Sequence, residues 1–224
     1  MDITLTHIPR EEVLRYLGCP GTEDPATLAL VEGCSARLLA AARPKWTYRV
    51  FDLAVQTDGV RLDCGLLLPG RDLAAHLRGC SRAALLAATL SAPVDALLRR
   101  AQAEDLAAAV ALDCCATAAV EAVCDLAEAE IRVRFPGCSF PFRYSPGYGD
   151  LPLTVQGELL SLLDAPRRVG LTASASHILI PRKSVTAILG VSDREIARNK
   201  RSCLGCPAQG GCQYRKAGGH CGLL

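Results

Sequence analysis

The feature that most constrains the fold of this chain is an uninterrupted stretch, residues 104–132, that contains neither glycine nor proline. These two residues are the least favourable ones inside a helix, and the stretch is rich in alanine, a strong helix former. Pro136 and Gly137 follow it closely and supply a stop signal. The sequence therefore predicts one long helix that ends before Pro136.

Shorter segments surround this helix and decide the fold class. Apolar spacing and capping signals predict further helices at residues 9–17, 26–42, 93–101 and 154–163. Alternation and β-branched runs predict strands at residues 46–55, 60–68, 168–172, 176–180 and 184–191, with a hairpin turn at Asp58-Gly59. Residues 81–89 fit either state, and residues 193–201 form a polar connector with a helical end. Helices and strands in blocks predict an α+β fold, with helices packed on a mainly antiparallel sheet.

Length and charge exclude several classes of protein. The chain has 224 residues, half of them hydrophobic, which suits one compact domain and a tail. A net charge of +2, with few aromatic residues among the basic ones, argues against nucleic-acid binding. The N-terminus lacks the pattern of a secretory signal, and Asp113 interrupts the longest apolar stretch. We therefore expect a cytoplasmic protein without a membrane span.

The twelve cysteines fall into two groups. Eight are scattered through the predicted helices and strands, where reduced and mostly buried thiols are expected. The other four lie in a glycine-rich tail that has few apolar residues to bury, and four thiolates around one metal would supply the missing folding energy. We predict a domain over residues 1–200 and a metal-binding tail over residues 201–224, with zinc or a [4Fe–4S] cluster held by Cys203, Cys206, Cys212 and Cys221. A disordered thiol-rich tail and opportunistic disulfides are the alternatives.

Residues 143–150 form the candidate ligand-binding segment. Pro146 and Gly147 predict a stiff turn between Arg143 and Tyr148. An arginine offers a planar fork for a carboxylate, and a tyrosine offers a flat face and a hydroxyl group. The pair suits a ligand with an acidic group and an aromatic or cationic part. The alternative is an ordinary turn beside an exposed arginine.

This segment and the residues after it resemble the reactivation domain of cobalamin-dependent methionine synthase. That family carries an Arg-Pro-x-Pro-Gly-Tyr loop, a short helix ending in Leu-Leu-Asp, an Ile-Gly-x-x-Leu-Thr strand entry and a Pro-x-x-Ser-Val-Ser segment. The corresponding residues here are 143–148, 157–164, 169–172 and 181–186, in the same order and with similar spacing. A fainter resemblance covers residues 89–95 and the predicted helix around residue 120.

The resemblance implies a binding site for S-adenosylmethionine (AdoMet). Arg143 would bind the ligand carboxylate, the Ser145 backbone would contact the adenosyl or amino-acid part, and Tyr148 would pack on the ligand. Glu121 falls where the family has an acidic residue that lines the site. The chain departs from the family in having Gly137 and Thr154 where a second acidic residue and a histidine occur.

The resemblance also implies a function: a reactivation component that presents the AdoMet methyl group to the oxidised cobalamin of a partner. The partner would be a cobalamin-dependent methionine synthase that lacks its own reactivation domain, and an electron donor would be needed. The chain is too short for separate homocysteine, folate and cobalamin regions, so we do not expect it to methylate homocysteine alone. The alternatives are a corrinoid-docking or partner-docking module, or a metal-dependent redox sensor, that does not use AdoMet.

Overall fold

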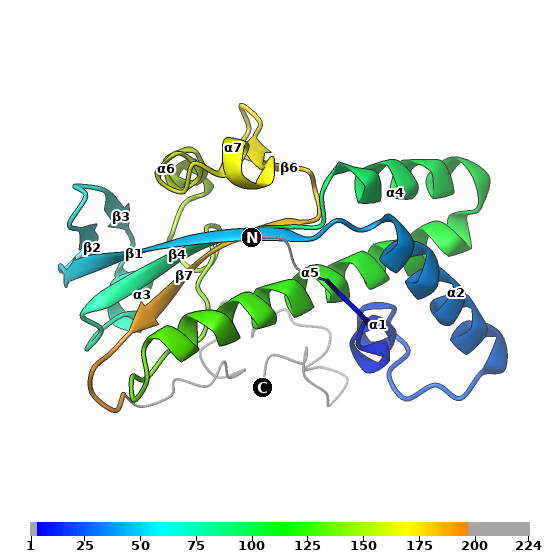
Figure 1. The fold of residues 1–224 in the computed structure, drawn as a ribbon, viewed down its shortest axis with the longest axis horizontal. Coiled ribbons are helices and arrows are strands. Elements are labelled where there is room, and N and C mark those ends of the chain that lie inside the picture. Colours follow the sequence, from blue (N-terminus) through cyan, green and yellow to red (C-terminus); the bar gives the residue numbers. More distant parts are fainter. Residues whose placement is uncertain (1–3, 197–224) are drawn as a thin grey trace. The chain divides into compact units, whose positions relative to one another are not determined.

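The computed structural model describes residues 4–196 of the chain, and Figure 1 shows the order of its elements. The fold is α+β, as predicted. Five strands form one sheet in the order β3-β2-β1-β4-β7, and two short strands form a second. The strands of the large sheet are β1 (Lys45–Val55), β2 (Gly59–Leu62), β3 (Leu67–Pro69), β4 (Arg82–Thr89) and β7 (Ser184–Val191). The helices are α1 (Arg10–Tyr16), α2 (Pro25–Ala41), α3 (Arg71–His76), α4 (Ala92–Glu104), α5 (Leu106–Arg134), α6 (Gln156–Leu162) and α7 (Ala165–Val169).

Backbone hydrogen bonds show that the large sheet is antiparallel. β1 pairs with β2, and β2 with β3, in antiparallel register. The bonds that flank β4 run from its end to the start of β7 and from its start to the end of β7, which is also the antiparallel pattern. The small sheet pairs β5 (Thr172–Ala173) with β6 (Leu179–Ile180).

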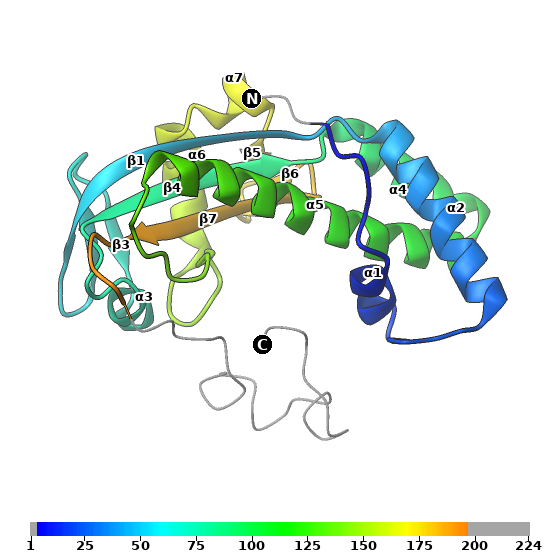
Figure 2. The same cartoon turned by 60° about the horizontal axis from the view of Figure 1, so that its bottom comes forward.

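The described residues group into two compact units. The first comprises residues 4–49, 85–134 and 156–186, and the second comprises residues 50–84, 135–155 and 187–196. In the first unit, α1, α2 and α4 pack against α5 (Figure 2). Small residues such as Ala111, Ala119 and Ala127 are fully buried along α5, which allows the other helices to approach it closely. The long helix predicted from sequence is therefore the centre of this unit's core.

Side-chain caps fix where the helices of the first unit begin. Asp24 accepts hydrogen bonds from the amide and the hydroxyl of Thr27 at the start of α2, and Pro25 occupies the first turn. Asp105 accepts one from the Ala108 amide at the start of α5. α5 is long enough and apolar enough in composition to cross a membrane, but 61% of its most apolar window is buried within the protein. Core packing therefore accounts for its apolar character.

Four predicted elements differ from the structure. The strand predicted at residues 176–180 is confirmed only at Leu179–Ile180, which form β6. The strand predicted at residues 60–68 is divided into β2 and β3 by a turn at Gly65, which has a φ of 90°. The strand predicted at residues 168–172 is wrong over residues 168–171, because residues 165–169 form helix α7 and strand β5 begins only at Thr172. Pro166 lies in the first turn of α7, and Gly170 ends this helix in the left-handed conformation. The connector is not helical over residues 193–196.

Candidate functional site

The candidate loop, residues 143–150, belongs to the second unit and is anchored to β7 at its beginning. The amide of Tyr144 donates to the carbonyl of Ile188 at 2.9 Å, and the amide of Ile188 donates back to Tyr144 at 2.8 Å. Two residues that donate to each other in this way form a hydrogen-bonded pair of an antiparallel ladder. The entry to the loop is therefore held by sheet pairing.

A tight turn follows this anchor, as the sequence predicts. The Tyr148 amide donates to the Ser145 carbonyl at 3.0 Å, with Pro146 and Gly147 at the two central positions. Gly147 has a φ of 91°, as the third residue of a type II turn requires. The Gly147 amide donates to the carbonyl of Leu151 at 2.8 Å, and the Leu151 amide donates to Tyr148 at 3.0 Å. The loop is closed by its own backbone.

Aromatic side chains of α3 and of the loop itself pack against one another and support the loop. The ring of His76, at the end of α3, lies 4.1 Å from the ring of Phe142 and 5.1 Å from that of Tyr144, measured between centroids. His76 Nε2 donates to the Phe142 carbonyl at 2.8 Å. Tyr144 is 6% exposed and contacts Tyr148 edge-on, whereas Tyr148 is 42% exposed. Tyr148 is therefore an exposed residue whose ring packs against the buried ring of Tyr144.

Arg143 lies between two residues that face His76. Side chains of an extended chain alternate between its two sides, so the Arg143 side chain leaves the backbone on the side opposite to Phe142 and Tyr144. It is half-buried, as is Ser145. The structure thus places Arg143, Ser145 and Tyr148 on one short, closed loop.

The electrostatic environment of the loop keeps Tyr144 protonated. Burial, and then the negative charges of Asp72 and Asp150, raise the pKa of the Tyr144 phenol to about 12. The protonated hydroxyl donates to the carbonyl of Tyr148 at 3.2 Å. The hydrogen bond from the Tyr144 hydroxyl therefore fixes the loop backbone at Tyr148.

Glu121, the fourth predicted ligand residue, belongs to the first unit. It is half-buried on α5, and its charge contributes to raising the pKa of the Tyr16 phenol, for which burial is the main cause. On the same face of α5, Glu128 accepts a hydrogen bond from Arg132 Nη2 at 2.6 Å and forms an ion pair with it. Thr154 is exposed in a short 3-10 helix at Leu153–Val155.

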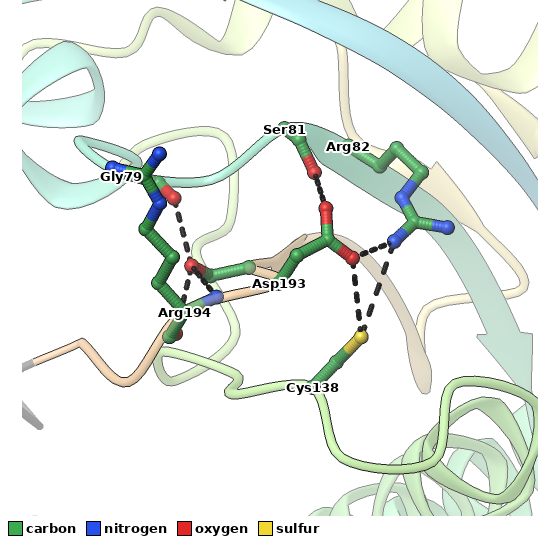
Figure 3. Close-up of polar contacts among 7 residues, drawn as sticks. Gly79, Ser81, Arg82, Cys138, Asp193 and Arg194 are labelled. Atoms are coloured by element: carbon green, nitrogen blue, oxygen red, sulfur yellow. Dashed lines mark hydrogen bonds and ion pairs between the residues drawn. The ribbon is translucent and has the colours of Figure 1, made fainter.

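The sequence does not reveal a polar cluster of the second unit, which Figure 3 shows. The Asp193 carboxylate accepts a hydrogen bond from the Ser81 hydroxyl at 2.6 Å and pairs with Arg82. The Cys138 thiol lies 3.5 Å from the same carboxylate, and burial and that charge raise the pKa of the thiol. Residues 81, 138 and 193 are far apart in sequence, so no local pattern could have predicted this cluster.

The thiols and the other side chains able to bind a metal ion are scattered among the described residues. All eight cysteines there are free thiols, as expected for reduced residues. Four of the eight are buried: Cys34, Cys80, Cys115 and Cys124. Residues 4–196 hold no group of three or more histidine, cysteine or acidic side chains arranged to bind a metal ion. The predicted ligands Cys203, Cys206, Cys212 and Cys221 lie outside the described residues.

Comparison with known proteins identifies the fold. No family model and no curated protein sequence matches the chain. A crystal structure described as the MetH reactivation domain bound to AdoHcy matches it with a TM-score of 0.65, over 88% of this chain and 79% of that chain. The fold is that of a reactivation domain. Sequence identity is 13%, so the likeness establishes the fold and leaves the ligand of this chain to be tested.

Proposed function

We propose that this chain binds AdoMet and acts as a reactivation component for a cobalamin-dependent methionine synthase. The observation that carries the proposal is the match to a reactivation domain over 88% of the chain. The neighbour's bound AdoHcy is AdoMet without its transferable methyl group. The closed loop that presents Arg143 and Tyr148 gives the proposal a site on this chain.

The chemistry of the loop suits the two ends of AdoMet. The guanidinium of Arg143 would form paired hydrogen bonds with the ligand carboxylate. Tyr148 is 42% exposed, and its ring would offer a face for the adenosyl group. The Ser145 backbone would contact the adenosyl or amino-acid part. Because turn bonds and sheet pairing already hold these residues, little conformational entropy is lost when the ligand binds.

Glu121 would supply the negative charge of the proposed AdoMet site. Glu121 belongs to the first unit and the loop to the second, so this role is carried by the resemblance to the family alone, which implies a carboxylate near the ligand ammonium or sulfonium. An acidic group there would favour AdoMet, which carries the positive sulfonium, over AdoHcy, which does not.

The reaction would take place on the cobalamin of a partner synthase that lacks its own reactivation domain. AdoMet supplies a methyl group that, with one electron from a separate donor, converts cob(II)alamin to methylcobalamin and leaves AdoHcy. This chain would contribute binding and orientation, which can account for a large part of a barrier when reacting groups are held in line. In this proposal the protein acts in the cytoplasm, as predicted from its N-terminal sequence.

A remethylation assay tests this function. A synthase without its reactivation domain, converted to cob(II)alamin, is incubated with a one-electron reductant, AdoMet carrying a labelled methyl group and this chain. We expect label on cobalamin only when the chain is present, and a loss of at least tenfold in rate for Arg143→Ala. Arg99→Ala, an exposed arginine of α4, is the matched control and should retain full activity.

Two outcomes separate this function from the docking alternative. Label transfer that needs the chain supports the reactivation role. Formation of a complex between the chain and the synthase, without AdoMet binding and without label transfer, would replace it with a docking module.

A further inference from the structure

The loop is held at its far end by Asp150, a residue that the sequence does not single out. Its carboxylate accepts a hydrogen bond from the amide of Arg71 at 2.7 Å and another from the amide of Asp72 at 3.1 Å. These amides are the first two of helix α3. They have no partner within the helix, so an acceptor from elsewhere in the chain satisfies them. Asp150 therefore joins the end of the loop to α3 within the second unit.

Two glycines make this contact possible. A side chain on Gly70 would place its first carbon 2.5 Å from Asp150 Oδ1. A side chain on Gly149 would collide with the Tyr144 hydroxyl and with Asp72 Oδ2. Both glycines have positive φ, 132° and 50°. The close approach of the loop to α3 thus requires that neither Gly70 nor Gly149 carries a side chain.

The charge of Asp150 acts on the loop in two ways. A carboxylate that accepts amide hydrogen bonds makes stronger bonds than a neutral oxygen does, and its charge is favourable at a helix start. After burial and the charge of Asp72, it also helps raise the pKa of Tyr144, so the bond to the Tyr148 carbonyl persists to a higher pH than for a free phenol. Near neutral pH, Asp150 therefore acts on the loop through its hydrogen bonds to α3.

We propose that Asp150 is a positioning residue: by bonding the start of α3, its carboxylate holds Arg143 and Tyr148 in the arrangement that receives the ligand. The proposal rests on AdoMet being that ligand. Asp150 itself touches no ligand atom and acts through the loop. Its removal should leave the fold in place and release the loop, so that ordering the loop is added to the cost of binding.

Calorimetric titration with AdoMet tests this role, at a temperature where every variant is fully folded. Asp150→Asn keeps one acceptor oxygen and loses the charge, whereas Asp150→Ala loses both. We expect AdoMet affinity to fall about tenfold for Asp150→Asn and further for Asp150→Ala, mainly through a less favourable binding entropy. Asp58→Asn is the control: Asp58 is exposed at a hairpin turn that accepts asparagine equally well.

Amide hydrogen exchange of the ligand-free protein supplies the second readout. Asp150→Asn should accelerate exchange at Arg71 and Asp72 and leave the amides of the β4 core strand unchanged. Faster exchange at these two amides with unchanged AdoMet affinity would overturn the positioning role. If the unaltered protein does not bind AdoMet, the proposed function fails; exchange then decides whether Asp150 anchors the loop, and unchanged exchange would overturn that too.

Discussion

The hydroxyl group of Tyr144 donates a hydrogen bond to the main-chain carbonyl of Tyr148, four residues further along the chain, at 3.2 Å. Tyr144 is 6% exposed and Tyr148 is 42% exposed. One buried tyrosine therefore supports the backbone of an accessible one. This relationship gives the candidate loop its stiffness and leads to the first two predictions.

Replacing Gly149 with alanine should break the loop. The new methyl group would collide with the Tyr144 hydroxyl and Asp72, at a backbone φ of 50° that alanine rarely adopts. We expect a loss of about 1–3 kcal/mol in the free energy of unfolding, measured in urea, and a loss of AdoMet binding. Gly157→Ala is the matched control, because its position in α6 is open and its change should be neutral or stabilising.

Tyr144 should make the stability of the protein depend on pH in the alkaline range. Its pKa is raised from 10.0 to about 12, so its contribution is fully present below pH 10 and is lost as the pH rises towards 12. Tyr144→Phe keeps the ring and loses the hydroxyl, at a cost of about 1 kcal/mol at pH 7. Denaturant unfolding from pH 8 to 12 should show the advantage of the unaltered protein shrinking above pH 10. A constant difference across that range would contradict the account.

Buried thiols add a separate alkaline effect that the Tyr144 comparison cancels. Burial raises the pKa of both Cys80 and Cys115 to about 11. Their contribution is lost between about pH 9 and pH 11 in both proteins. The difference between the two unfolding curves therefore reports on Tyr144.

Lys183 is tethered by its ammonium group to α5 within the first unit. Its ammonium is 2.9 Å from Asp113 Oδ1, 3.0 Å from Thr117 Oγ1 and 3.2 Å from the Asp113 carbonyl, and the side chain is 16% exposed. We expect Lys183→Met to lower the free energy of unfolding by about 1–2 kcal/mol, since it leaves acceptors of α5 without this donor.

The exposed pair Arg100–Glu104, with side chains 74% and 54% exposed, is the comparison for Lys183. Arg100→Met should cost only about 0.3–0.5 kcal/mol, because water screens such pairs. Equal losses for the two substitutions, measured in the same urea titration, would show that the Lys183 contacts contribute no more than a surface ion pair.

The tail cysteines predict a bound metal that elemental analysis can identify. Protein purified without oxygen should carry either zinc, or iron with a visible absorption band of a cluster. Changing Cys203, Cys206, Cys212 and Cys221 to serine should remove the metal. Metal retained after all four changes, or none in the unaltered protein, would contradict this prediction.

How far the sequence predicts the fold depends on the range of the interactions involved. The long helix could be predicted because every turn from residue 106 to residue 134 carries the same local signal. β4 could not be distinguished from a helix, because it is buried along almost its whole length and shows no alternation. α7 was missed because Val169 and Leu171 suggest a strand, while Pro166 and Gly170 set the helix bounds.

The loop was predictable only in part. Pro146 and Gly147 predict the turn, and the structure confirms it. The pairing of Tyr144 with Ile188 and the bond from Arg71 to Asp150 join residues distant in the sequence, and such contacts leave no periodic pattern. The ligand roles of Arg143, Ser145, Tyr148 and Glu121 remain predictions.

The measurement that tests the central claim most directly is a calorimetric titration of the folded protein with AdoMet, alongside Arg143→Ala and Arg99→Ala. The account predicts saturable binding at one site, weakened at least tenfold by Arg143→Ala and unchanged by Arg99→Ala. Absence of binding by the unaltered protein, or equal binding by all three, would contradict the placement of AdoMet on this loop.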